Sequence, residues 1–152
     1  MTGNLTIINQ SGAALDLINL EGITGYIVAE ERPLVSYEIA LTLVNSAEMR
    51  SLNRRFRGQD ATTDVLSFTV EGDDLPIQIR DEVLIGDIVI DINQIEKQRG
   101  HINVKDELIR VYIHGLLHLL GYDHIRSQDK EVMEQTEQKY LTRMKGTNVG
   151  QQ

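Results

Sequence analysis

The sequence contains no cysteine and no long apolar run. Without cysteine, the chain can form neither a disulfide nor a thiolate metal site. No stretch approaches the roughly 20 apolar residues that a membrane-spanning helix needs. The first ten residues also lack a basic region followed by an apolar run, which a secretory signal would have. We therefore expect a cytoplasmic protein that does not span a membrane.

The chain also lacks an excess of positive charge. Its 15 Lys and Arg residues face 23 Asp and Glu residues, which gives a formal net charge of −8. This charge excludes a broadly basic, histone-like binder of nucleic acid. Residues 60–91 carry the whole excess, with nine acidic residues and one basic residue, and the rest of the chain is balanced. Residues 50–57, just upstream, hold four arginines and no acid, so a basic patch adjoins an acidic one.

The length of 152 residues, with 41% hydrophobic and 25% charged residues, is typical of one globular domain. We expect that domain to span residues 1–152, with a frayed polar tail at 146–152. Apolar alternation and short apolar runs predict strands at 5–8, 37–43, 65–70 and 83–90. Helical spacing predicts helices at 20–32, 45–58, 92–98, 105–120 and 127–144. This order predicts an α+β fold, a mixed β-sheet covered by helices.

Three of the four histidines fall in the string HGLLHLLGYDH at residues 114–124. His114 and His118 would lie one helical turn apart on one face, so their imidazoles can point to a common position. Gly121 allows the helix to end in a left-handed turn, after which His124 can return to that position. Three imidazoles and an open fourth position form a catalytic rather than a structural zinc site. The alternative is scattered histidines, with one or two in the core, but buried imidazoles need a partner and a metal supplies one.

The spacing of these histidines is also that of the metzincin metalloproteases, whose second motif position is a glutamate that acts as general base. That position is Gly115 in this chain, which makes peptidase activity the weaker interpretation. A glycine inside a buried helix costs about 1 kcal/mol relative to alanine. We therefore expect that Gly115 leaves room for a substrate larger than an extended peptide.

Three motifs of this chain resemble the YbeY family of bacterial zinc-dependent endoribonucleases, which act in ribosomal RNA maturation. They are HGLLHLLGYDH, LNRRFRGQDATTDVLSF at residues 52–68, and Gly-Asp-Ile at residues 86–88. The resemblance implies a zincin-like metal-dependent hydrolase with a three-histidine site on a long central helix. It implies that His114, His118 and His124 bind one Zn2+ per chain and that Arg57 is an essential active-site arginine. Imidazole ligands alone would suit other transition metals as well.

The resemblance further implies a single-strand-specific endoribonuclease that acts in small-subunit ribosomal RNA 3′ end maturation and in ribosome quality control. Ribosomal RNA would be the partner, with ribosomal proteins or assembly GTPases as further candidates, and we expect no DNA specificity and no membrane partner. Two alternatives are a zincin-type metallopeptidase and a noncatalytic ribosome-assembly factor whose metal stabilises the fold. The acidic loop at 71–82 is a candidate docking segment for a basic ribosomal protein or a solvated loop.

The arginine patch offers cations for a phosphodiester substrate. Arg57 carries a planar guanidinium that matches the geometry of phosphate. Arg50, Arg54 and Arg55 are candidates for RNA binding, and the alternative for them is a solvated helix face.

The general base is not decided by the motifs. Asp64, Asp87 and Asp123 are candidates either for that role or for orienting the histidines, and the alternative for each is a turn or a helix cap. Water and the ribose 2′-OH are both possible nucleophiles. A 2′,3′-cyclic phosphate at the product end, as opposed to a simple phosphate, would identify the 2′-OH.

Overall fold

The computed structural model describes residues 3–14, 19–70, 82–123 and 126–146. The strands are β1 (Gly3–Asn9), β2 (Ser36–Val44), β3 (Val65–Thr69) and β4 (Val83–Asp91). The helices are α1 (Leu20–Glu31), α2 (Ser46–Arg57), α3 (Ile92–Gln98), α4 (Val104–Leu119) and α5 (Ser127–Gly146). Every predicted element is confirmed to within about two residues at each end. Most of the predicted tail and acidic loop lie outside the described residues.

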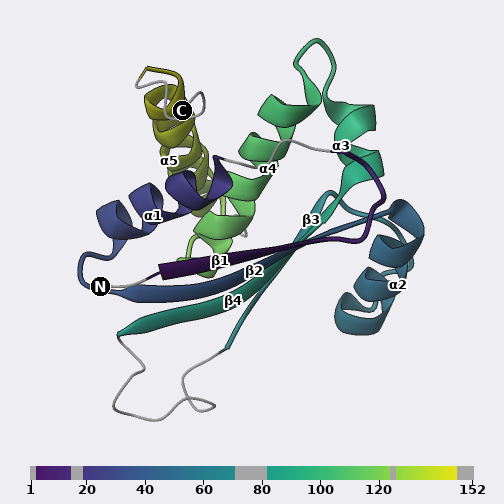
Figure 1. Ribbon diagram of the computed structural model, residues 1–152, viewed down its shortest axis with the longest axis horizontal. Helices are drawn as coiled ribbons and strands as arrows, with labels where there is room; N and C mark the ends of the chain where they lie inside the picture. The colour runs from purple at the N-terminus through teal and green to yellow at the C-terminus, as the bar shows by residue number, and fades with distance from the viewer. Residues whose placement is uncertain (1–2, 15–18, 71–81, 124–125, 147–152) are drawn as a thin grey trace.

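The four described strands form one sheet in the order β1-β2-β4-β3. β1, β2 and β4 are parallel, whereas β3 runs antiparallel to β4 at one edge, with Ser67 opposite Ile88. Figure 1 shows α1, α4 and α5 on one side of the sheet and α2 on the other. The predicted α+β fold with a mixed, helix-covered sheet is therefore confirmed. None of the described helices is both long enough and apolar enough to cross a membrane.

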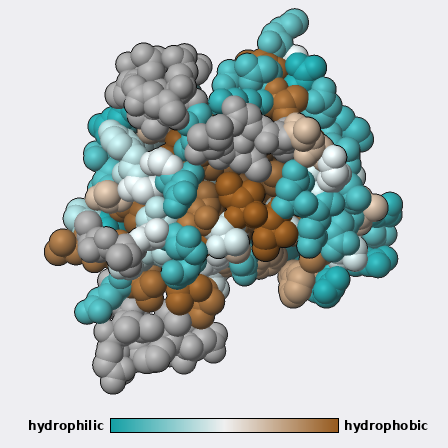
Figure 2. Space-filling model, viewed as in Figure 1, coloured by the Kyte–Doolittle hydropathy of each residue, from teal (hydrophilic) through white to brown (hydrophobic). Residues whose placement is uncertain are grey.

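The sheet separates two hydrophobic clusters. The larger lies under α1, α4 and α5 and contains Ile88 and Ile90, and the smaller packs Met49 of α2 against Val89. Successive residues of a strand point to opposite faces, so β4 contributes to both clusters. Burial of each such aliphatic side chain stabilises the fold by roughly 1.5–3 kcal/mol. In Figure 2, hydrophobic side chains accordingly gather toward the middle of the molecule, and hydrophilic ones cover the outer sides of the helices.

Two glycines let α4 lie close to the sheet. A Cβ atom on Gly86 of β4 would approach Leu119 Cδ2 to 2.8 Å, and one on Gly115 of α4 would lie 3.0 Å from Val65 Cγ2 and 3.1 Å from Ile88 Cγ2. Such contacts are tighter than a packed core accepts without shifts. The expectation that Gly115 makes room for a substrate is wrong, because this residue is buried against β3 and β4 and serves helix packing.

Both ends of α4 are defined by local hydrogen bonds. Asn103 caps the helix, since its Oδ1 accepts from the backbone N of Asp106 at 2.8 Å. Gly121 adopts a φ of 103°, a left-handed conformation that glycine reaches without strain. Its N–H donates to the carbonyl of His118 at 3.1 Å. The predicted glycine-terminated helix is therefore confirmed, and the chain turns sharply just beyond His118.

Candidate active site

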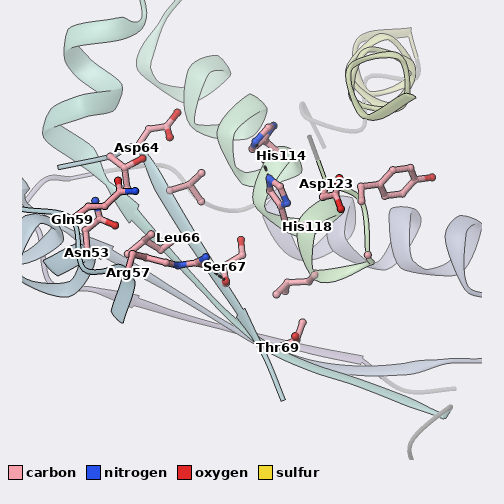
Figure 3. Close-up of a pocket in the computed structure, with 15 residues that line it drawn as sticks. Asn53, Arg57, Gln59, Asp64, Leu66, Ser67, Thr69, His114, His118 and Asp123 are labelled. Atoms are coloured by element: carbon pink, nitrogen blue, oxygen red, sulfur yellow. Dashed lines mark hydrogen bonds between the residues drawn. The ribbon is translucent and has the colours of Figure 1, made fainter. Parts of the chain in front are cut away.

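A pocket of about 700 Å³ lies beside the edge strand β3, between the end of α2 and the second half of α4. Arg57, Asp64, His114, His118 and Asp123 are among the residues that line it. Figure 3 shows the two histidines side by side, with Asp64 and Asp123 to either side of them in this view. The fold thus gathers five of the ten predicted functional residues around one hollow.

His114 and His118 project from α4 into this pocket, and both are half-buried. Their Nε2 atoms are 3.2 Å apart, and the two rings meet edge to face at an interplanar angle of 76°. Helical spacing of four residues produces this convergence, as the sequence predicted. Two ring nitrogens therefore face one position from the same wall of the pocket.

The spacing of these nitrogens suits a zinc ion. Zn–N bonds of 2.0–2.1 Å in tetrahedral geometry place two ligand nitrogens about 3.3–3.4 Å apart, close to the observed 3.2 Å. Among the described residues, no group of three or more His, Asp or Glu side chains forms a complete metal site. The third expected ligand, His124, lies outside them. The structure therefore describes two of the three expected ligands, and the positions of their nitrogens fit a zinc ion.

Glu137 of α5 lies directly behind His114. Its Oε2 atom is 2.9 Å from Nδ1 of His114, and its side chain is 12% exposed. An ionised carboxylate can only accept, so Nδ1 carries the proton of this hydrogen bond. A histidine ring held in this way presents Nε2 as a lone-pair donor, the form that metal ligands take.

Arg110 and Glu107 of α4 continue this contact away from the pocket. Arg110 donates from Nε and Nη2 to the two carboxylate oxygens of Glu107 at 2.8 and 2.6 Å, and its Nη1 lies 3.4 Å from Oε1 of Glu137. Gln98 joins Glu107 to Asp64 through bonds of 2.8 and 3.1 Å from its Nε2. We call the set Glu107, Arg110, Glu137 and Gln98 the α4 network.

Electrostatics within the α4 network favour its charged forms. The hydrogen bond from Arg110 is the largest cause that lowers the pKa of Glu107, and burial opposes it. The same bond is the largest cause that raises the pKa of Arg110. Glu107 is only 2% exposed, so a buried carboxylate is retained here as an ion because it is fully hydrogen-bonded.

Arg57, the last residue of α2, crosses the edge of the sheet to reach the pocket. Its Nη2 donates to the carbonyl of Ser67 at 3.1 Å, and its guanidinium lies 5.4 Å from the ring centroid of Phe68. Ser67 in turn donates from Oγ to the carbonyl of Gly115 at 3.0 Å. The arginine and the histidine helix are therefore joined through β3, and Figure 3 shows the Arg57 side chain extended toward Ser67.

Comparison with known proteins assigns this chain to a family. The family model described as "Endoribonuclease YbeY" matches residues 10–145. A protein named Endoribonuclease YbeY from Ruthia magnifica is 43% identical over 109 residues, covering 70% of this chain and 72% of its own length. The chain belongs to the endoribonuclease YbeY family. A protein of the same name from Leptospira interrogans is 40% identical over 125 residues, which cover 72% of this chain and 88% of that one.

A solved structure shares this fold. The solution structure of a Thermotoga maritima protein is 29% identical in sequence and superimposes with a TM-score of 0.65. The match covers 97% of this chain and 93% of the other. The family's three motifs in this chain thus belong to a fold that a relative shares along nearly its whole length.

The structure places the three candidate aspartates differently relative to the pocket. Asp64 and Asp123 line the pocket, and Oδ2 of Asp64 accepts from Gln98. Asp87 is exposed on β4 and shares its side of the strand with Val89, which faces α2. It is not among the residues that line the pocket. The structure therefore does not bring Asp87 together with the histidines, because strand alternation turns it to the other face of the sheet, and its role as general base or orienting group stays a prediction.

The other arginines of α2 lie outside the pocket lining. Arg50 donates from Nε and Nη2 to the two carboxylate oxygens of Asp60 at 2.8 and 3.1 Å, and both side chains are more than half exposed. Arg54 and Arg55 are also exposed, and the guanidinium of Arg55 lies 5.4 Å from the ring centroid of Phe56. Arg54 and Arg55 therefore fit an outer contact surface better than Arg50, whose Nε and Nη2 donors already bind a carboxylate.

Glu137 and Arg110 were not among the residues predicted from the sequence. A signal for Glu137 was available, because this residue lies four positions after Met133 and three before Tyr140, on the stripe that predicted the last helix. A carboxylate on an apolar stripe needs a buried partner. Which helix would supply that partner depends on how α5 packs on α4, which no local pattern encodes.

Proposed function

We propose that the protein is a zinc-dependent, single-strand-specific endoribonuclease. Membership of the endoribonuclease YbeY family supports the reaction class. The observation that carries the proposal is the convergence of the His114 and His118 Nε2 atoms, 3.2 Å apart, in the pocket that also receives Arg57. A metal position and a phosphate-binding cation in one pocket suit phosphodiester cleavage.

In this proposal, His114, His118 and His124 hold one zinc ion within a zincin-like single domain of residues 1–152. Zinc there would supply Lewis-acid chemistry, by polarising a phosphoryl oxygen and lowering the pKa of water to about 7. The sheet, with α4 across it and an antiparallel edge strand beside the pocket, supports such an architecture. The larger core supports one domain, since it joins residues of α1, α4 and α5 to three strands.

Arg57 is the proposed catalytic arginine. Its guanidinium has five N–H donors, and the bond to Ser67 holds one of them at the edge of β3. The remaining fork can bind the nonbridging oxygens of a phosphate and stabilise the negative charge that grows on them during cleavage. The cation–π contact between Arg57 and Phe68 favours this orientation of the fork.

Asp64 and Asp123 are the proposed proton-transfer candidates, because both line the pocket. Asp64 is anchored by Gln98, whereas Asp123 follows the left-handed turn at Gly121. A carboxylate within hydrogen-bonding reach of a water or a 2′-OH can take its proton as the phosphorus is attacked. Separate replacement of each by asparagine, with the pH dependence of cleavage, distinguishes the two.

An aromatic cluster beside Arg57 supports single-stranded RNA as the substrate. Phe56 is 57% exposed, and its ring centroid is 5.5 Å from that of Phe68. Arg55 and Arg57 each lie 5.4 Å from one of these rings. Exposed aromatic rings beside arginines form a surface on which unpaired bases stack while cations contact the backbone. In this proposal, Arg54 adds charge to the same surface.

The cellular role follows the family resemblance. We propose that the protein acts in the cytoplasm on ribosomal RNA, in small-subunit 3′ end maturation and quality control. The net charge of −8 means that RNA must be held locally rather than by a broad basic surface. Ribosomal proteins or assembly GTPases would then bring the substrate to the pocket.

The decisive test incubates zinc-loaded protein with structured RNA and with casein. We expect cleavage of single-stranded RNA regions, no cleavage of casein, and loss of RNA cleavage in a His114→Ala variant. A His101→Ala variant, altered at an exposed histidine outside the pocket lining, is the matched control and should remain active. Casein cleavage would support the peptidase alternative, and the absence of any cleavage would support a noncatalytic role.

A further inference from the structure

We infer that Glu137 is a positioning residue that holds His114 in the Nδ1–H form, and that Arg110, itself held by buried Glu107, aims the Glu137 carboxylate. This inference rests on the proposed function, since His114 matters as a metal ligand within it. The four residues of the α4 network lie outside the three motifs on which the family resemblance rests.

The two oxygens of the Glu137 carboxylate face different partners. Oε2 lies 2.9 Å from Nδ1 of His114, and Oε1 lies 3.4 Å from Nη1 of Arg110. One oxygen thus meets the imidazole while the other faces the guanidinium. Rotation of the carboxylate would break both contacts together, so its orientation toward the ring is fixed.

The contact with Glu137 determines the tautomer of His114. Because an ionised carboxylate only accepts, the neutral ring must carry its proton on Nδ1. Its Nε2 then presents a lone pair toward Nε2 of His118 at 3.2 Å. Without Glu137 the neutral ring could take either tautomer, and the tautomer with the proton on Nε2 cannot bind a metal there.

Arg110 is in turn anchored by Glu107. Glu107 accepts both Nε and Nη2 of Arg110 at 2.8 and 2.6 Å, a bidentate pair that leaves the guanidinium little rotational freedom. Gln98 donates to Oε2 of the same Glu107 carboxylate and also to Oδ2 of Asp64. The α4 network therefore extends from Asp64 on one part of the pocket wall to His114 on another.

An ion-pair network that only ties α5 to α4 is the competing explanation. Buried ion pairs are often replaceable by apolar residues without loss of stability, so stability alone does not explain why the network ends on an imidazole. Orientation of metal-binding histidines by carboxylates is a recurrent arrangement, and its removal typically lowers metal affinity by about 10- to 100-fold. The two explanations predict different results for the histidine ring itself.

The test compares Glu137→Ala, Glu137→Gln and the control Glu134→Gln, which changes an exposed carboxylate on the same helix. Imidazole 15N chemical shifts of metal-free protein report the His114 tautomer, and titration against a chromophoric chelator reports zinc affinity. We expect Glu137→Ala to lose the pure Nδ1–H pattern and to bind zinc about 10- to 100-fold more weakly. Glu137→Gln should retain part of both properties, because its amide oxygen still accepts, and Glu134→Gln should match the wild type.

Unchanged 15N shifts in both Glu137 variants would overturn the inference, as would zinc affinity within twofold of the wild type in both. If Glu137→Ala does not fold, the comparison of Glu137→Gln with Glu134→Gln decides. Failure of the proposed function looks different. In that case the wild type binds no zinc or cleaves no RNA, while the tautomer in metal-free protein still tests the role of Glu137.

Discussion

The two helices that border the pocket place the same kind of ion pair in opposite environments. On α4, Arg110 donates to a glutamate that is 2% exposed, and the pair continues to His114 through Glu137. On α2, the Arg50–Asp60 pair is more than half exposed, and solvent screens it. The α4 side therefore holds charges in fixed directions, as a metal site requires, while the α2 side presents cations that a mobile substrate can reach.

The largest effect is expected at Arg57 of α2, the residue proposed to bind the reacting phosphate. Arg57→Ala should lower RNA cleavage by about 100- to 1,000-fold, the usual loss when one donor to a developing charge is removed. Its zinc content should stay equal to that of the wild type, because the histidines are untouched. Arg99→Ala is the control, since Arg99 bonds Glu96 and is not among the residues that line the pocket. An active Arg57→Ala enzyme would refute the assignment.

The next effect concerns the buried pair on α4. Glu107→Gln keeps the size of the side chain but removes the charge that faces Arg110. Hydrogen bonds to charged groups contribute about 1.5–3 kcal/mol, so the free energy of unfolding should fall by about 2 kcal/mol in urea titrations. A variant as stable as the wild type would show that the α4 network contributes no more to stability than an exposed pair.

The contribution of Glu107 should also depend on pH. The pKa of Glu107 is lowered from its ordinary value of 4.5, chiefly by the hydrogen bond from Arg110. A carboxyl group with a lowered folded-state pKa contributes stability that is present above its unfolded pKa and is lost as pH falls through the folded value. The difference in unfolding free energy between wild type and Glu107→Gln should therefore be constant near neutral pH and shrink below about pH 4.5. A difference that grows on acidification would contradict this assignment.

A smaller effect is expected at the aromatic surface of α2. Phe56→Ala should weaken binding of a single-stranded oligoribonucleotide by about fivefold, the lower end of the range for one stacked base. Val132→Ala on α5 is the matched control, because Val132 is a similarly exposed apolar residue at 50%. Fluorescence anisotropy at fixed salt measures both. Equal weakening in the two variants would remove the stacking role.

The smallest effect is expected for the exposed pair itself. Asp60→Asn removes the partner of Arg50 while leaving the guanidinium in solvent. Because solvent screens such a pair, the melting temperature should stay within measurement error of the wild type. A loss of stability comparable to that of Glu107→Gln would erase the contrast between the two helices.

Local patterns predicted the elements of this fold better than their arrangement. The helical period and the glycine at 121 located α4, because both signals lie within the helix and its end. The order β1-β2-β4-β3 depends instead on pairing between distant segments, such as Gly3 with Tyr37. Short apolar runs do not specify their neighbours, so the sequence led only as far as a mixed sheet.

The site shows the same limit at the level of single residues. His114 and His118 were predictable because four-residue spacing on one helix determines their convergence. The face of the sheet to which Asp87 points was not predictable. Because β4 is apolar on both faces, hydropathy does not show which of its residues point to which face. Gly115 was misinterpreted for a related reason, because the sheet residues that it packs against, Val65 and Ile88, lie in other parts of the chain.

The central claim is that His114, His118 and His124 hold a zinc ion that serves RNA cleavage. Zinc K-edge X-ray absorption of the zinc-loaded protein tests the first half directly, with RNA cleavage measured on the same sample. We expect one zinc ion per chain, with three imidazole nitrogens at about 2.0–2.1 Å and an oxygen ligand, and loss of this spectrum in His118→Ala. A wild-type protein that cleaves RNA without bound zinc, or whose zinc shows no imidazole scattering, would contradict the account.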